Sequence, residues 1–244
     1  MNQDLGVSIT WIGHGTVLYR SPKGKTVLVD AWVDGNPAAP PAAKALPKLD
    51  LVLITHGHGD HVDDLASIAK EHNPDIVCIY ELAHFYETKG WQKIHGMCKG
   101  GTLPLHGLKV TMVHAVHSNS VVDGDRVLPA GDAAGFVIEF ESGTRVYHAG
   151  DTDVFSDMKL IGEIYRPTIA ALPIGDLYTM GPLQASYAAK MLGVNYVLPI
   201  HHSTFPALTG TLAEFQKRLE GSGIEVLAVK PGESVGMAEA AQSK

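Results

Sequence analysis

The chain has 244 residues, of which 45% are hydrophobic and 18% charged, and this composition excludes a disordered protein. A formal net charge of −7 argues against nucleic acid as a partner, and two cysteines are too few for a disulfide framework. The first residues, MNQDLGVSIT, lack the pattern of a signal peptide, and no window is long enough to span a membrane. We therefore expect a cytoplasmic protein without a membrane partner.

The first third of the chain is rich in short β-branched runs separated by glycine turns. These runs predict strands at 7–12, 16–20, 25–32 and, buried on both faces, 49–55. A Pro- and Ala-rich stretch at 35–48 predicts a surface loop, because its prolines interrupt regular structure. Helical spacing of apolar residues follows at 62–72.

A strand at 75–80 and a helix at 81–90 lead into a second β-rich segment. This segment predicts strands at 107–116, 135–140 and 145–150, after which helices and strands alternate. Two β-rich segments, each followed by helices, favour two sheets packed face to face with helices outside, an αββα sandwich. Periodicity alone leaves an open α/β sheet as the alternative. Because no composition break marks a linker, we expect a single domain over 1–244.

The run VLITHGHGDH at 52–61 concentrates potential metal ligands directly behind a buried strand. A solvated polar turn is the alternative, but imidazole and carboxylate together suit Zn²⁺ and similar divalent ions. His56 and His58 occupy alternate positions of an extended loop and can converge on one ion. Asp60 and His61 turn into the next helix and can hold a second ion. Each ion needs about three or four protein ligands, so other strand ends must contribute.

Three later strand ends carry suitable side chains. VHAVHSNS offers His114 and His117, and we favour His117 because His114 lies inside the strand pattern. YHAGDTD places Asp151 after a strand and a glycine turn. LPIHHSTFP offers His201 at the end of a strand and His202 one position beyond.

These motifs together resemble the metallo-β-lactamase superfamily. WIGHGTVLY, LPIGDLYTMGP and PIHHSTFP are similar to the small metal-dependent hydrolases related to ascorbate-6-phosphate lactonase. The resemblance covers residues 9–235 and implies the αββα sandwich. It also implies two ions with one bridging ligand: His56, His58 and His117 for the first, Asp60, His61 and His201 for the second, and Asp151 shared.

Other polar residues near these motifs have two interpretations each. The resemblance places His14 near the metals, but its GHG turn also suits a backbone hydrogen bond. Asp30 ends a strand either as a turn residue or, as we favour, as a residue that orients a ligating histidine. His148 lies within a strand and suits a buried core position. The candidates for protonating a leaving group are Asp60, His14 and His202.

Two cations about 3.5–4 Å apart lower the pKa of a shared water, so hydrolysis needs no Ser or Cys nucleophile. We therefore expect a hydrolase that uses a metal-bridging hydroxide on a small-molecule lactone, ester or phosphoester. Zn²⁺ is the first expectation, and Mn²⁺ or Fe²⁺ suit the same ligands. The alternatives are a non-catalytic metal- or ligand-binding domain of this fold and a phosphodiesterase or nuclease. Homo-oligomerisation stays open.

Overall fold

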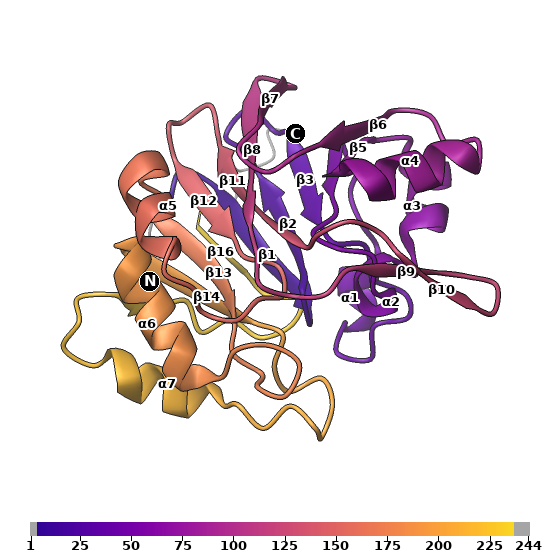
Figure 1. Cartoon of the computed structure of the whole chain (residues 1–244). Helices are drawn as coiled ribbons and strands as arrows, with labels where there is room; N and C mark the ends of the chain where they lie inside the picture. Colours follow the sequence, from indigo (N-terminus) through magenta and orange to yellow (C-terminus); the bar gives the residue numbers. More distant parts are fainter. Residues whose placement is uncertain (1–3, 237–244) are drawn as a thin grey trace.

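The computed structural model describes residues 4–236 and contains two seven-stranded sheets with helices on their outer sides (Figure 1). The indigo to purple strands of the first part of the chain form one sheet together with the yellow strand β16, and the later strands, apart from the hairpin β9–β10, form the other. This arrangement confirms the predicted αββα sandwich. The alternative of one open sheet is wrong, because the two β-rich segments pair within themselves rather than with each other.

The first sheet, sheet A, has the strand order β16-β1-β2-β3-β4-β5-β6. Its strands run antiparallel from β16 to β3 and parallel from β3 to β6. The last strand of the described chain therefore returns to the first sheet. The bounds are β1 Ser8–Gly13, β2 Thr16–Arg20, β3 Thr26–Val29, β4 Leu51–Leu53, β5 Asp75–Ile79, β6 Ile94–Met97 and β16 Ser234–Val235.

The second sheet, sheet B, has the order β15-β14-β13-β12-β11-β8-β7 and is antiparallel from β7 to β12 and parallel beyond. Its bounds are β7 Thr102–Leu105, β8 Leu108–His114, β11 Ala134–Glu139, β12 Arg145–His148, β13 Ile169–Pro173, β14 Tyr196–Ile200 and β15 Glu225–Val226. A separate hairpin, β9 Ser120–Asp123 and β10 Arg126–Pro129, interrupts this order between β8 and β11.

Short helices lie beside both sheets (Figure 1). Those beside sheet A are α1 Pro41–Lys44, α2 Gly59–Val62, α3 Leu65–His72 and α4 Tyr80–Thr88. Those beside sheet B are α5 Met158–Tyr165, α6 Pro182–Leu192 and α7 Leu212–Leu219. Within residues 4–236, no helix is both long enough and apolar enough to cross a bilayer.

Two apolar cores follow from the alternation of side chains along the strands. The core between the sheets contains Val110 and Phe136, and the core between sheet B and its helices contains Val113 and Tyr147. Polar side chains instead follow the strands at one edge of the sandwich, where β4, β12 and β14 end.

Several strands are shorter than predicted; the strand expected over 49–55, for example, is β4 at Leu51–Leu53. Three further differences concern the first part of the chain. The strand expected over 25–32 stops at Val29, because Asp30 has a left-handed φ of 59°. The helix expected over 62–72 begins at Leu65. Asp64, which precedes it, accepts a hydrogen bond from the backbone amide of Val33 through Oδ2. The stretch 35–48 contains the short helix α1 in addition to loop.

Candidate metal centre

The HGHGDH segment leaves the sheet at the end of β4 and enters α2. Gly57 makes this path possible, because a Cβ there would lie 2.6 Å from the backbone oxygen of Ser120. Its amide donates a 2.8 Å hydrogen bond to Oδ1 of Asn119. The histidine segment of sheet A is thereby held against the loop that follows β8 of sheet B.

The first group of candidate ligands consists of His56, His58 and His117, whose nitrogens lie within 4.8 Å of one another. Nε2 of His117 is 3.3 Å from Nδ1 of His58. His114 is exposed and lies instead beside Lys99, with 2.9 Å between Nδ1 and Nζ. The structure thus brings His117, rather than His114, into the group.

Asp151 lies at the middle of the cluster. Its Oδ2 is 3.2 Å from Nε2 of His201, 3.3 Å from His61, 3.7 Å from His117 and 3.9 Å from His56. Gly150 before it has a φ of 62°, and a Cβ there would lie 2.6 Å from Cβ of Thr55. The glycine turn after β12 therefore lets the carboxylate reach histidines from both sheets.

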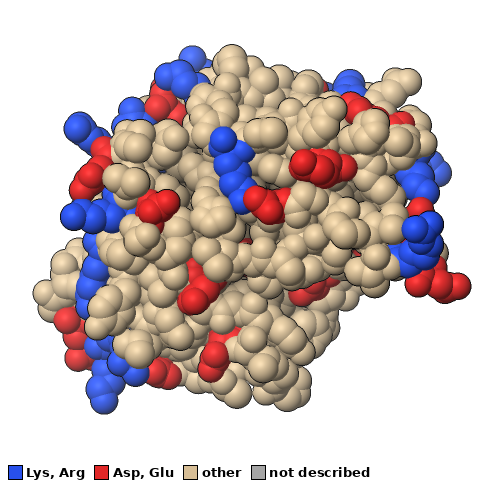
Figure 2. Space-filling view, viewed as in Figure 1, with Lys and Arg blue, Asp and Glu red and all other residues tan. Residues whose placement is uncertain are grey.

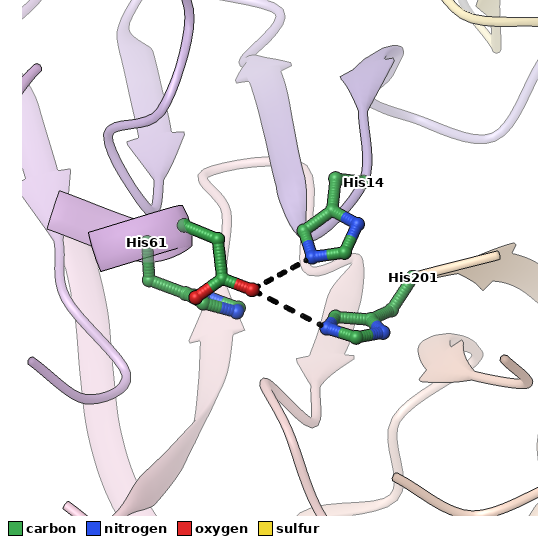
Figure 3. Close-up of side chains that lie close together, drawn as sticks. His14, His61 and His201 are labelled. Carbon is green, nitrogen blue, oxygen red and sulfur yellow. Dashed lines mark hydrogen bonds and ion pairs between the residues drawn. The ribbon is translucent and has the colours of Figure 1, made fainter. Parts of the chain in front are cut away.

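A second group contains His14, Asp60, His61 and His201, again within 4.8 Å. Figure 3 shows dashed lines from the rings of His14 and His201 to one carboxylate oxygen. This oxygen is Oδ2 of Asp60, which lies 3.0 Å from Nε2 of His14 and 3.9 Å from Nε2 of His201. The structure thus gathers all seven predicted ligands and adds His14, which the sequence left open.

The donor atoms fit a divalent cation. Nε2 of His56, His61 and His201 and Oδ1 of Asp151 are buried, and none has a hydrogen-bond partner within residues 4–236. A buried polar atom without a partner costs about 1–3 kcal/mol. The three nitrogens lie within 3.9 Å of the other oxygen of Asp151, Oδ2, so cations shared by these side chains would explain the four unpartnered atoms. Imidazole with carboxylate is a suitable donor set.

The protonation states of His56 and Asp151 favour metal binding. Burial and the neighbouring charge of His61 hold the pKa of His56 well below 6.5, so its ring is neutral at pH 7. Burial opposes ionisation of Asp151, but the charges of His201 and His61 outweigh it and keep its pKa well below 3.8. A neutral imidazole and an ionised carboxylate are the forms that ligate metals. Burial lowers the pKa of His61, but the carboxylates of Asp151 and Asp30 outweigh burial and raise this pKa, so this histidine would release its proton when a metal binds.

Two residues behind the ligands hold them in place. Oδ2 of Asp30 accepts hydrogen bonds from Nδ1 of His61 and from Oγ1 of Thr55. Oγ1 of Thr55 lies 3.0 Å from Nδ1 of His56, so the same carboxylate orients one histidine of each group. This geometry matches the positioning role expected for Asp30. Thr55 carries no signal in the sequence beyond its place before His56.

Both ring nitrogens of His14 make hydrogen bonds, one with Asp60 in the cluster and one with Thr204. Burial lowers the pKa of His14 to about 4, so the ring is neutral. Because the carboxylate of Asp60 only accepts, Nε2 of His14 donates to it, and Nδ1 accepts from the hydroxyl of Thr204 at 2.9 Å. Burial raises the pKa of Asp60, but the hydrogen bond from His14 and the charge of His61 bring it below 3.8.

Two further histidines lie outside these groups. His202 is buried and its ring stacks on Trp11 at 4.9 Å, so the catalytic role considered for it stays a prediction. His148 is buried as expected, with Nδ1 2.9 Å from the hydroxyl of Tyr19. Thr204 and Asn119, which bind the cluster and its loop, had no spacing or motif that would identify them.

The comparisons with known proteins agree with this geometry. A model of the beta-lactamase superfamily domain matches residues 25–202. A UPF0173 metal-dependent hydrolase of Koribacter versatilis is 49% identical over 94% of this chain and 97% of its own. A second one, of Chloroflexus aurantiacus, is 44% identical over 94% and 97% of the two chains.

A solved structure shares the same arrangement. Igni18, a metallo hydrolase from the archaeon Ignicoccus hospitalis, has a TM-score of 0.83 and 35% identity, covering 94% of this chain and 97% of its own. The fold and the family thus agree with the resemblance seen in the motifs. The chain belongs to the beta-lactamase superfamily and, within it, to the family of UPF0173 metal-dependent hydrolases.

Proposed function

We propose that the chain is a dinuclear metal-dependent hydrolase of small molecules. The observation that carries this proposal is the convergence of four histidine Nε2 atoms within 3.9 Å of one oxygen of Asp151. One ion would take His56, His58 and His117, the other Asp60, His61 and His201, with Asp151 shared. Zn²⁺ is the first candidate, and Mn²⁺ or Fe²⁺ suit the same donors.

The chain's own contribution to catalysis centres on Asp60 and His14. Divalent ions bound here would supply Lewis acidity, which lowers the pKa of a water and polarises a scissile carbonyl or phosphoryl group. The side chain of Asp60 is 35% exposed, so it faces the substrate side of the cluster. His14 donates a hydrogen bond to this carboxylate, which fixes its orientation and keeps it ionised as a proton acceptor.

The loops beside the ligands favour an uncharged substrate with an apolar group. Thr152, next to Asp151, binds both the amide of Val116 and the amide of Met180, so the loops carrying these residues meet at the cluster. They expose Val116, Leu177 and Tyr178, which are 44%, 63% and 59% accessible.

The charges in these loops are acidic, and the nearby charge of Lys99, in the loop between β6 and β7, is already paired. Asp153 and Asp176 are exposed, and the charge of Lys99 beside His114 is paired with Asp132 at 2.9 Å. Figure 2 shows scattered acidic side chains over the largely tan centre of this face. A phosphate group would meet acidic neighbours here, so we favour a lactone or carboxylic ester over a phosphoester.

A non-catalytic ligand-binding domain is the second candidate, because ligands alone do not prove turnover. Metal analysis of the purified protein, followed by assays with lactones, aryl esters, bis-(p-nitrophenyl) phosphate and nitrocefin, separates the candidates. We expect metal-dependent turnover of a lactone or ester. A metal-loaded protein that hydrolyses none of these substrates would contradict the proposal.

A further inference from the structure

The outer face of sheet B carries a second site, separate from the candidate metal centre. A surface groove of about 370 Å³ lies where α5 ends, with its floor formed by β7, β8, β11 and β12. Val137 and Glu139 of β11 line it, whereas Ile138 between them points into the core between the sheets. The groove therefore opens on the opposite side of the sheet from that core.

The groove has more positive than negative charge. Lys109, Arg145 and Arg166 line it, with Glu139 as the carboxylate among them. Glu139 accepts hydrogen bonds from Lys109 at 2.8 Å and from Nε of Arg145 at 2.7 Å. These two bonds lower the pKa of Glu139, so it is ionised and offsets one of the three cations. A net positive groove is notable on a chain whose formal charge is −7.

Arg166 is the cation without a partner. Its guanidinium makes no hydrogen bond or ion pair with any residue in 4–236. It also ends α5 with a left-handed φ of 48°, a conformation that L-residues other than Asn and Asp seldom adopt. The corresponding position of α6 is Gly193, which adopts this conformation without strain. Because glycine can end a helix in this conformation, the end of α5 does not account for an arginine at this position. A role for its positive charge in the groove would account for it.

We propose that this groove binds a small organic phosphate. Its uncompensated charge matches a doubly charged phosphoryl group, and the planar fork of a free guanidinium suits phosphate oxygens. The hydroxyls of Thr102 and Thr111 in the same groove are hydrogen-bonded to each other at 2.8 Å, and the one that accepts in this pair can donate its own hydrogen to a ligand. Val137 supplies an apolar floor, and a volume of about 370 Å³ is that of a small ligand. Figure 2 shows Lys and Arg side chains along the left edge, where Figure 1 places α5.

The site does not depend on the proposed hydrolase activity, and binding is therefore its test. Pyrophosphate and inorganic phosphate are titrated into the full-length protein by calorimetry at low ionic strength. Arg166→Gln and Lys109→Gln each remove a cation from the groove. Because charge-assisted hydrogen bonds to phosphate are strong, we expect each change to weaken pyrophosphate binding about tenfold.

Two variants serve as matched controls. Arg126→Gln removes the same charge from the exposed hairpin strand β10, and Lys159→Gln removes a cation that lines only the neighbouring groove on the other side of Arg166. Both should bind pyrophosphate as the parent protein does, and all four variants should keep its metal content and Tm. Equal weakening in the controls, binding that ignores Arg166 and Lys109, or no binding at about 10 mM would each overturn the proposal.

Discussion

Oδ2 of Asp30 lies 2.7 Å from Nδ1 of His61, and both side chains are completely buried. The same carboxylate also accepts from Thr55, which contacts His56. One residue behind the cluster thus fixes the ring orientation of a histidine in each candidate ligand group.

Asp30→Asn should therefore weaken metal binding without removing a ligand. Loss of such an orienting partner commonly costs about 10–100-fold in metal affinity. The measurement is competition with a chromophoric chelator, read alongside bound metal per chain. Asp34→Asn, at an exposed position, is the control and should keep the parent affinity. Equal affinities of the two variants would show that Asp30 does not position the ligands.

The two histidines near the end of β8 should respond differently to removal. His117→Ala takes away a candidate ligand and should lower bound metal to about one ion per chain or less. His114→Ala should leave the metal content unchanged, because that side chain is exposed and contacts Lys99. Elemental analysis after dialysis against metal-free buffer measures both. The reverse order would move the ligand assignment to His114.

Acid should destabilise the fold partly through His148. Burial lowers the pKa of His148 to about 4 from 6.5, so the unfolded chain binds its proton first as the pH falls. Stability from this neutral histidine is complete above pH 6.5 and is lost towards pH 4. Between about pH 7 and pH 5 the free energy of unfolding should fall by about 2 kcal/mol from this residue.

Urea unfolding in the presence of EDTA measures this effect. His148→Asn, whose amide can still reach Tyr19, should show a shallower fall with pH than the parent protein. His84→Asn, at an exposed position, should keep the parent slope. A parent-like slope for His148→Asn would mean that other groups account for the acid sensitivity.

The apolar loop beside the ligands should select substrates by chain length. Tyr178→Ser should raise KM for a long-chain ester or substituted lactone about tenfold, because apolar contact area is lost, and should leave the acetyl ester unchanged. Tyr187→Ser on α6 is the control, since both tyrosines are 59% exposed. Steady-state kinetics on paired short and long substrates decides this. A uniform change in kcat for both would point to a disturbed cluster instead of a contact with the substrate.

Local patterns predicted most of the regular structure because they depend on neighbours in sequence. The strands predicted at 16–20 and 75–80 and the helix predicted at 81–90 lie within two residues of the observed β2, β5 and α4. The short strands β6 and β7 and the hairpin lack such a pattern, because edge strands bury few side chains. Their existence depends on pairing with distant segments.

The candidate centre was predictable where ligands are crowded or follow a strand. Close spacing behind a buried strand identifies four candidate ligands in the sequence: His56, His58, Asp60 and His61. His14 does not, because its partners Asp60 and Thr204 lie 46 and 190 residues away. The predicted roles of all these residues in catalysis stay predictions until metal and substrate are measured.

The seven predicted ligands come from both sheets: four follow β4, and the other three follow β8, β12 and β14. A nascent or proteolysed chain that lacks either sheet therefore has only some of the candidate metal ligands. Because only the complete sandwich would present all the ligands, cation binding would stabilise the folded state in which both sheets have packed together.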